Sequence, residues 1–371
     1  MNDHMTTRSL LYVTTYDRTL GHLGGAAWVD NRILNEVPKS WRMQEFVVTN
    51  VDPEPVELEV RSNKRLLAAT LARMALHREP YITAKFRQSR NWTRRIVALQ
   101  RAAASTNFVV TSQWPALLLA LDAGIQVDVH IAHNVDYLLS ELHDPLPLRA
   151  LGNARRTKRA ELQSLKHARK TLALSSHDRE RLVAHGVDSG HLLLTAGTLS
   201  KPKIERTRQI GFIGKASWPP NQVALNSLRN EVLPAVRDVM GADAPGLIVA
   251  GRGMQDIEGL NVETMGEVDN VADFYERIDL VVIPRGSVSS GVSVKMLEAL
   301  DYGVHVIAPD HLVEAVGNAD GCESAASLDE ITTAIVRHYR EESPDVKPTR
   351  TPAPSRTTIE EFWRTVGDSR R

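Results

Sequence analysis

The clearest pattern along the chain is an alternation of short apolar runs with longer amphipathic segments. In the second half, apolar runs are separated by stretches whose apolar positions recur every three or four residues. Runs that are apolar throughout are typical of strands in a parallel sheet covered on both faces, and the stretches between them are typical of helices. The expected strands are 209–214, 247–251, 262–266, 280–284 and 304–309, and the expected helices are 222–237, 271–278, 292–302 and 328–339.

The first half of the chain repeats this pattern less regularly. One segment, 148–170, places its apolar residues on one stripe and its basic residues on the other face, as in an amphipathic helix. The expected strands of this half are 10–14, 46–49, 108–111, 127–132 and 171–175, and the other expected helical regions are 63–77 and 91–104.

These elements form two α/β units. The chain has 371 residues, which is too long for one ordinary domain and suits two of about 150–200 residues. The stretch 196–207 is polar and turn-rich, as linkers are. We therefore expect an N-terminal domain over 1–198 and a C-terminal domain over 207–345. The remainder, 346–371, begins rich in Pro, Thr and Arg and ends in an amphipathic pattern at 358–366, so we expect a linker and a helix that docks back onto the body.

The charge balance changes the picture of possible partners. The chain has 45 basic and 45 acidic residues, so it has no overall attraction to nucleic acid and we expect no nucleic-acid partner. Basic residues nevertheless gather in 85–101 and 149–170. These stretches are either solvated helix faces or a surface for an anionic acceptor, such as a lipid-linked phosphate or an anionic membrane surface.

Cysteine content and hydropathy bear on the compartment. Cys322 is the only cysteine, which excludes an internal disulfide and a cysteine-based metal site and fits a reducing cytosol. No apolar run approaches the roughly 18–20 residues of a membrane span, and no signal peptide is visible. We expect a cytoplasmic protein, with peripheral binding at the inner membrane face as the alternative raised by the basic stretches.

The most informative segment is 283–309, where a Gly/Ser loop joins a strand to a helix. The backbone amides of Gly291, Val292 and Ser293 lead into a helix N-terminus, which favours a bound anion. Glu298 follows within the helix, and a carboxylate can accept two hydroxyl hydrogen bonds. Phosphate at the helix start and hydroxyls at the carboxylate indicate a nucleotide-sugar site. No Asp-x-Asp pair follows a strand, so we expect no metal.

Several segments carry a family resemblance through their order and spacing. In the second half these are Phe212–Lys215, Trp218–Asn221, Leu247–Gly251, Gly266–Tyr275 and Ser290–Leu300, and in the first half Gly24-Gly25, Pro80-Tyr81, His133-Asn134 and Ser175–Asp178. Together they resemble the retaining glycosyltransferases of the GT-B fold, family 4 or group 1. The resemblance implies an α/β protein with two Rossmann-like doubly wound domains that face one another across a cleft. The N-terminal domain would serve the acceptor side and the C-terminal domain the nucleotide-sugar donor.

The resemblance also implies roles in donor binding. Glu298 takes the place of the second acid of the family's Glu-x7-Glu motif, which holds the ribose hydroxyls; the alternative is a solvated helix glutamate. Ser290 stands where the fuller motif has its first acid, which puts the usual contact to the donor sugar in question. The Gly291, Val292 and Ser293 amides would cradle the diphosphate.

Four basic residues are further donor-site candidates. Lys215 follows a strand-Gly turn, where relatives carry a basic residue that contacts the diphosphate, and it is a candidate catalytic residue; the alternative is a surface lysine. Lys295 would contact phosphate or pair with Glu298 one turn on. Arg285 follows a strand end on the expected ligand edge, as does Arg252.

In the first half, Gly24 and Gly25 follow the first strand. Relatives use such a loop for close backbone approach to the diphosphate, and a tight turn without a ligand is the alternative. His133 follows the strand 127–132 and corresponds to a histidine that relatives place beside the transferred sugar, so it is the second candidate catalytic residue. A structural loop histidine is the alternative.

The leading hypothesis is a metal-independent, retaining transfer of a hexosyl group from a nucleotide diphosphate sugar to an acceptor hydroxyl. The acceptor would be a sugar, a lipid-linked molecule or another small molecule, and no cofactor is expected beyond the donor substrate. A catalytically weak relative that binds nucleotide sugar or partners an active transferase is the second hypothesis, motivated by Ser290. An epimerase ranks third, since the sequence shows no clear acid/base set for it. The donor base, the donor sugar and the oligomeric state are left open.

Overall fold

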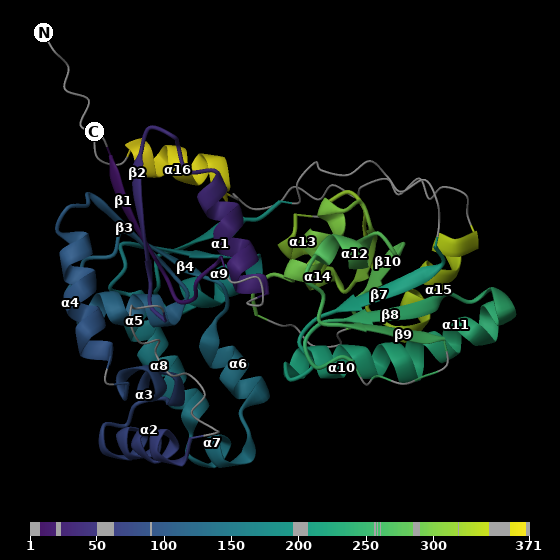
Figure 1. Ribbon diagram of the computed structural model, residues 1–371, viewed down its shortest axis with the longest axis horizontal. Helices are drawn as coiled ribbons and strands as arrows, with labels where there is room; N and C mark the ends of the chain where they lie inside the picture. Colours follow the sequence, from purple (N-terminus) through teal and green to yellow (C-terminus); the bar gives the residue numbers. More distant parts are fainter. Residues whose placement is uncertain are drawn as a thin grey trace, which may run out of the picture. The chain divides into compact units, whose positions relative to one another are not determined.

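The computed structural model describes two compact α/β units (Figure 1). The described residues are 8–19, 24–49, 63–89, 91–195, 207–255, 257, 259, 261–284, 290–317, 319–340 and 357–368. The first unit contains the described residues up to Leu193, the loop residues Ser290 and Gly291, and 357–368. The second contains the described residues from Leu194 to Pro284 and from Val292 to Arg340. Most of the expected linkers, 196–206 and 346–356, lie outside the described residues.

The first unit is built on a parallel sheet of seven strands in the order β13-β6-β5-β4-β3-β1-β2. The strand order reverses beside β1, which lies between β2 and β3. In such sheets ligands bind at the carboxyl ends of the strands next to this switch point. The strands are β1 (Ser9–Thr14), β2 (Arg42–Val47), β3 (Phe108–Ser112), β4 (Val129–Ala132), β5 (Lys170–Ala173), β6 (Ser189–Leu193) and β13 (Thr357–Thr358).

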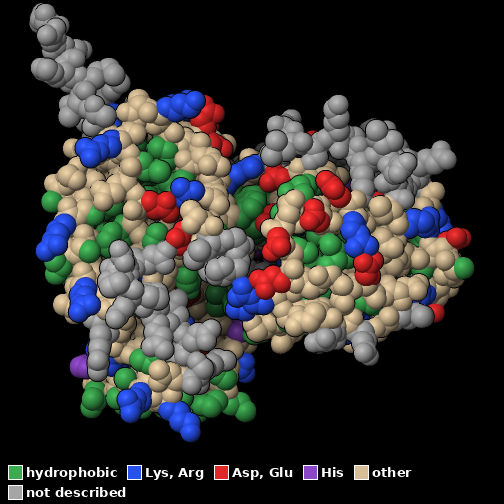
Figure 2. All heavy atoms as spheres, viewed as in Figure 1, with side chains coloured by type: hydrophobic (Ala, Val, Ile, Leu, Met, Phe, Trp, Pro, Cys, Tyr) green, Lys and Arg blue, Asp and Glu red, His purple; other side chains and the backbone are tan. Residues whose placement is uncertain are grey.

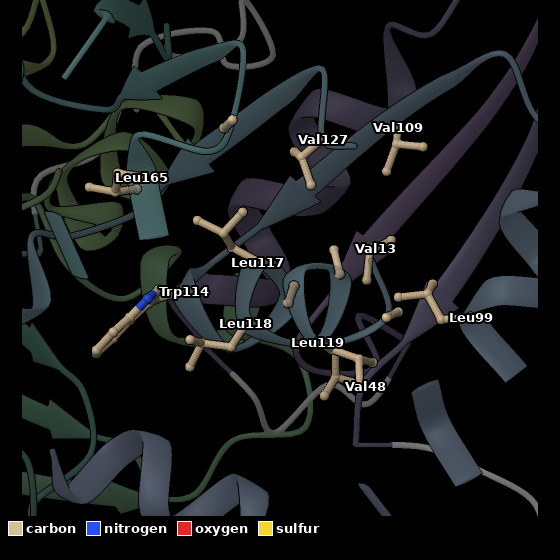
Figure 3. Close-up of a cluster of buried hydrophobic side chains, with 14 of the residues drawn as sticks. Val13, Val48, Leu99, Val109, Trp114, Leu117, Leu118, Leu119, Val127 and Leu165 are labelled. Carbon is tan, nitrogen blue, oxygen red and sulfur yellow. The ribbon is translucent and has the colours of Figure 1, made fainter. Parts of the chain in front are cut away.

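Helices of the first unit follow the strands in alternation. They are α1 (Gly25–Asn35), α2 (Lys64–Leu76), α3 (Tyr81–Arg87), α4 (Asn91–Ala103), α5 (Trp114–Asp122), α6 (Asp136–His143), α7 (Leu146–Ala150), α8 (Asn153–Leu165), α9 (Ser176–Ala184) and α16 (Ile359–Asp368). The helix α5 is the centre of the core: Figure 3 shows its Leu117 and Leu119 among buried side chains of β1 and α4, Val13 and Leu99. The helix α5 is buried on nearly every side and packs within the core of the first unit.

The second unit is a six-stranded parallel sheet in the order β12-β11-β10-β7-β8-β9. Its switch point lies between β7 and β10, so the turns after these strands border the expected ligand edge. The strands are β7 (Gln209–Ile213), β8 (Gly246–Ala250), β9 (Val262–Gly266), β10 (Leu280–Val282), β11 (His305–Ala308) and β12 (Cys322–Ser324). The helices are α10 (Pro219–Ser227), α11 (Leu233–Met240), α12 (Val271–Tyr275), α13 (Val294–Asp301), α14 (Asp310–Ala315) and α15 (Leu328–Arg340).

Three expected elements differ from the structure. The helix at 148–170 is two helices, α7 and α8, because Gly152 has a left-handed backbone (φ 65°) between them; Leu151 of the expected stripe is exposed as a result. The strand at 46–49 begins earlier, at Arg42. The helix at 222–237 is interrupted by a π-helical turn at Leu228–Val232 (η2).

The basic stretch 85–101 is not a single solvated face. Arg95 is fully buried and donates to the Val47 carbonyl at 3.0 Å, and burial lowers its pKa to about 10. Arg87 forms ion pairs with Glu79 and Asp122. These arginines hold elements of the first unit together, so fewer basic groups of this stretch face solvent than its sequence suggests.

Candidate functional site

Glu298 lies on α13, in contact with an aromatic residue of the helix α12. The Tyr275 hydroxyl donates to Glu298 Oε2 at 3.2 Å, and the Tyr275 ring stacks on Tyr302 with centroids 4.9 Å apart. Burial raises the pKa of Glu298 to about 7, although the Tyr275 bond and the positive charge of Lys295 lower it. In the sequence Tyr275 is only the last residue of the segment Gly266–Tyr275, and its contact with Glu298 becomes visible only in the folded chain.

The start of α13 carries an unsatisfied polar group. Ser293 is the N-cap residue, but its side chain makes no capping bond. It is 6% exposed, and its Oγ has no hydrogen-bond partner among the residues that the structure describes. A buried hydroxyl without a partner is unfavourable unless a ligand or another group completes it. The helix α13 therefore begins with donors suited to an anion.

Ser290 and Gly291, which precede this helix, belong to the first unit. The Ser290 hydroxyl accepts from the Val135 amide at 2.5 Å and donates to Asp178 Oδ2 at 3.0 Å, and the Gly291 amide donates to the same oxygen at 2.6 Å. The Gly291 amide is thus occupied in this structure. Among the three amides assigned to the diphosphate by resemblance, those of Val292 and Ser293 donate to no described residue.

Lys295 points into the second unit. Its Nζ donates to Asn221 Oδ1 at 2.8 Å and lies 4.3 Å from the centroid of the Phe212 ring. The same Asn221 donates from Nδ2 to the Lys215 carbonyl at 3.0 Å. Gly214 packs closely here, since a Cβ on it would come within 2.5 Å of Asn221 Nδ2. Asn221 therefore ties the turn after β7 to α13, a role that its place in a helix-start motif does not reveal.

The other basic candidates, Lys215, Arg252 and Arg285, do not share the buried contacts of Lys295 among the residues that the structure describes. The Lys215 side chain is exposed at the carboxyl end of β7 and forms no hydrogen bond or ion pair with a described residue. Arg252, at the end of β8, forms an exposed ion pair with Glu267 at 2.9 Å. Arg285 lies outside the described residues. Of the two described residues, Arg252 is paired, whereas Lys215 presents its charge unpaired at the switch point of the second unit.

In the first unit, Gly24 begins α1. It has φ 62° and ψ −139°, a conformation that favours glycine, and its carbonyl accepts from the Trp28 amide at 3.2 Å. A Cβ at Gly24 would meet no atom within 4 Å, so the backbone angle rather than crowding requires glycine. Gly25 is the first residue of α1. Residues 20–23 of the glycine loop lie outside the described residues.

His133 follows β4 and lies in a buried polar cluster. Its Nε2 is 2.8 Å from Ser112 Oγ and 3.5 Å from Asp30 Oδ1. The next residue after Ser112, Gln113, has φ 69° and ψ 151°, which is strained for a residue with a side chain. Strained residues of this kind concentrate at functional sites. Neither Asp30 nor Ser112 carries a sequence motif, so sequence reasoning missed both.

The comparisons with known proteins agree with this arrangement. Residues 207–341, nearly all of the described second unit, match the family described as Glycosyl transferases group 1. Anabaena HepE, solved with UDP and glucose, superimposes with a TM-score of 0.55 at 12% identity, covering 98% of this chain and 95% of that one. Both proteins share two Rossmann-like units. This chain has the GT-B fold.

Two further GT-B structures are similar over most of their length. Sucrose-phosphate synthase from Thermosynechococcus elongatus has a TM-score of 0.54 at 13% identity and covers 89% of each chain. The N-terminal domain of trehalose-6-phosphate phosphatase from Candida albicans has a TM-score of 0.56 at 12% identity, covering 90% of this chain and 91% of that one. No curated protein matches the chain.

Among the described residues, no group of three or more His, Cys, Asp and Glu side chains is arranged to hold a metal ion. No helix of the described part is long and apolar enough to cross a membrane.

Proposed function

We propose that this protein transfers a hexosyl group from a nucleotide diphosphate sugar to an acceptor hydroxyl, with retention of configuration and without a metal. The observation that carries the proposal is the helix α13, which places an incompletely bonded carboxylate, Glu298, five residues beyond Ser293, the buried N-cap residue whose hydroxyl has no partner among the described residues. The two hydroxyls of a ribose would supply hydrogen-bond donors to the carboxylate, and a phosphate would accept from the donors at the start of the helix. The group 1 family match over 207–341 supports the same assignment.

The residues then divide by role. Glu298 would accept two ribose hydroxyls, while the Val292 and Ser293 amides and the Ser293 hydroxyl would hold the diphosphate. The exposed Lys215 ammonium would stabilise the negative charge that grows on the leaving diphosphate, which is the largest electrostatic requirement of the reaction. In the first unit, His133 would contact the transferred sugar. HepE was solved with UDP-glucose, which makes UDP sugars the first donors to test.

The test is transfer and binding measured together. The chain is incubated with UDP-, GDP-, ADP- and TDP-sugars and candidate acceptors, product is detected by mass spectrometry, and donor binding is measured by calorimetry. We expect one nucleotide class to bind, Glu298→Ala to abolish that binding, and chelator to leave turnover unchanged. A chain that binds no nucleotide sugar, or binds one equally well without Glu298, refutes the proposal.

A non-catalytic role is the second candidate, favoured by Ser290. This serine stands where the family's fuller motif has an acid, and its hydroxyl binds Asp178 and the Val135 amide. Under this alternative the chain binds nucleotide sugar tightly and transfers it to no acceptor. Calorimetric binding without product from any donor and acceptor pair would select it over the transferase.

The acceptor side of the proposal includes an anionic membrane surface. Met74 of α2 and Leu148 of α7 pack in one buried cluster, so the ends of these helices are adjacent. Beyond them Leu76 and Leu146 are each 80% exposed. Figure 2 shows hydrophobic side chains among Lys and Arg at this end of the first unit. Apolar side chains flanked by basic ones are typical of surfaces that bind anionic lipid.

Vesicle sedimentation tests this surface. The wild-type chain should sediment with vesicles of anionic phospholipid and not with vesicles of zwitterionic phospholipid. Replacing both Leu76 and Leu146 by serine should reduce sedimentation, while Leu328→Ser, at an exposed leucine of the second unit, should not. Equal sedimentation of all three proteins refutes the assignment.

A further inference from the structure

Asp30 is a buried carboxylate that the proposed roles leave unexplained. It lies on α1, is 1% exposed, and receives hydrogen bonds from residues on two strands. Thr14 Oγ1 donates to its Oδ2 at 2.6 Å, while Tyr12 OH and Ser112 Oγ donate to its Oδ1 at 2.7 and 2.6 Å. A carboxylate is rarely buried this completely unless it is fully hydrogen-bonded. Its partners gather at the carboxyl ends of β1 and β3, beside the switch point of the first unit.

Three hydroxyls donate to the two oxygens of Asp30, which is the arrangement expected of an ionised carboxylate and constrains its neighbours. Burial alone would raise the pKa of Asp30, but hydrogen bonds and charge from His133, with the bonds from Ser112 and Thr14, outweigh burial and hold that pKa below its usual value. An ionised carboxylate accepts hydrogen bonds and donates none. The Ser112 hydroxyl, 2.6 Å away, must therefore point its single proton at Asp30.

This orientation fixes the proton of His133. Since the Ser112 proton is directed at Asp30, Ser112 Oγ can only accept from His133 Nε2, 2.8 Å away. His133 Nε2 also lies 3.5 Å from Asp30 Oδ1. The proton of a neutral His133 is consequently on Nε2. Its Nδ1, on the other side of the ring, bonds to no described residue.

We propose that Asp30 is a positioning residue that fixes the ring and the tautomer of His133, so that Nδ1 is the nitrogen presented beyond the end of β4. Resting on the proposed function, this assigns Nδ1 of His133 to a hydroxyl of the transferred sugar, and it makes Asp30 act on the reaction only through His133. Three other groups interact electrostatically within this cluster: His130 on β4, Asp136 on α6, and Tyr12 on β1.

The direct test reads the tautomer by NMR. In protein labelled with nitrogen-15 at histidine, long-range proton–nitrogen correlations distinguish Nε2–H from Nδ1–H, and the His133 signals are assigned with His133→Gln. The wild-type chain should show Nε2–H. In Asp30→Asn the neutral amide accepts fewer bonds, which frees the Ser112 proton to turn to Nε2, so the His133 proton should move to Nδ1. An unchanged tautomer in Asp30→Asn overturns the proposal.

Thr14→Val is the matched control. It removes one bond to the same carboxylate but touches the other oxygen, Oδ2, so it should lower the melting temperature while leaving His133 as Nε2–H. In metal sites, partners that fix a histidine tautomer are worth about 10–100-fold in affinity or activity, and we expect Asp30→Asn to lower kcat by a similar factor with KM for donor changed less than about threefold. Equal loss of kcat in both variants overturns the proposal.

A double-variant cycle separates positioning from general damage. If Asp30 acts through His133, Asp30→Asn should lower kcat no further in a His133→Gln background, whereas an additive loss refutes that route. Failure of the proposed function can be distinguished from failure of this proposal. If the wild-type chain has no transferase activity, the assignment of His133 Nδ1 to the sugar fails, but the NMR measurement still decides whether Asp30 sets the tautomer of His133.

Discussion

Replacing Glu298 by glutamine should remove a cost to stability that depends on pH. Burial raises the pKa of Glu298 from 4.5 to about 7. Because the pKa of Glu298 is higher in the folded than in the unfolded state, folding favours the protonated carboxyl. The stability that the protonated carboxyl contributes to the folded state is complete below about pH 4.5 and is lost as the pH rises to about 7. The difference corresponds to about 3 kcal/mol at about 1.4 kcal/mol per pKa unit. Glutamine does not titrate, so Glu298→Gln should gain about 3 kcal/mol relative to wild type between pH 4.5 and pH 8.

The assay must report on the second unit. Trp218 is the only tryptophan between residues 115 and 362, so in fluorotryptophan-labelled protein its fluorine-19 resonance, assigned with Trp218→Phe, follows unfolding of that unit in urea. Unfolding is measured for wild type and Glu298→Gln at several pH values. Glu276→Gln, at an exposed carboxyl after α12, is the control and should show a difference from wild type that is flat with pH. A Glu298→Gln difference that is equally flat refutes the reasoning.

The same pKa has a consequence for the proposed donor. Only ionised Glu298 accepts two ribose hydroxyls, so donor affinity should rise with pH and level off above about 7, being roughly tenfold weaker at pH 6 than at pH 8. Binding near pH 6.5 should also release protons, because the ribose hydroxyls favour the carboxylate. Calorimetry in buffers of different ionisation enthalpy measures both effects. Affinity that is independent of pH in wild type contradicts this role of Glu298.

Three further changes test the packing around the sites. Asn221→Ala should lower stability by about 1–3 kcal/mol and weaken donor binding severalfold, since it removes the acceptor for Lys295; calorimetry and thermal unfolding check it. Gly251→Ala should be more destabilising than Gly241→Ala in thermal melts. A Cβ at position 251 would fall on the carbonyl of Gly214, whereas a Cβ at position 241 would meet no atom within 4 Å. Trp363→Ala should cost about 3–5 kcal/mol and Trp363→Phe less, because Trp363 is 1% exposed within the first unit; matching losses would contradict a packing role.

The sequence predicted best those strands that have another strand on each side of them in the sheet. The interior strands β7, β8 and β10 are continuous apolar runs that stand out without alignment. The predicted start of the edge strand β2, residue 46, is four residues too late in the sequence. The first residues of this strand, Arg42–Glu45, are mostly polar, and its pairing depends on the backbone of β1 alone. The helix α5 was missed because a short, wholly apolar run has no helical period to detect.

The two candidate site carboxylates, Glu298 and Asp30, also differ in how well the sequence predicts them. Glu298 was found because its spacing from the glycine loop lies within one strand-loop-helix segment. Asp30 was not, since a single acid in a helix ordinarily faces water. Its burial results from α1, β1 and β3 meeting, with Ser112 more than 80 positions away in sequence. A local pattern can therefore predict a ligand-binding segment, whereas a polar cluster assembled from distant segments needs the fold.

Asp30 and Glu298 also show why burial alone does not decide the charge of a carboxyl group. Asp30 receives three hydroxyl bonds and lies beside His133, and its pKa is lowered despite burial. Glu298 receives one hydroxyl bond, from Tyr275, and its pKa is raised to about 7. The number of donors therefore separates a carboxylate that the fold itself completes from one that it leaves incomplete. An incomplete carboxylate gains most from hydroxyls brought by a ligand, so Glu298 is suited to binding and Asp30 to holding a neighbour in place.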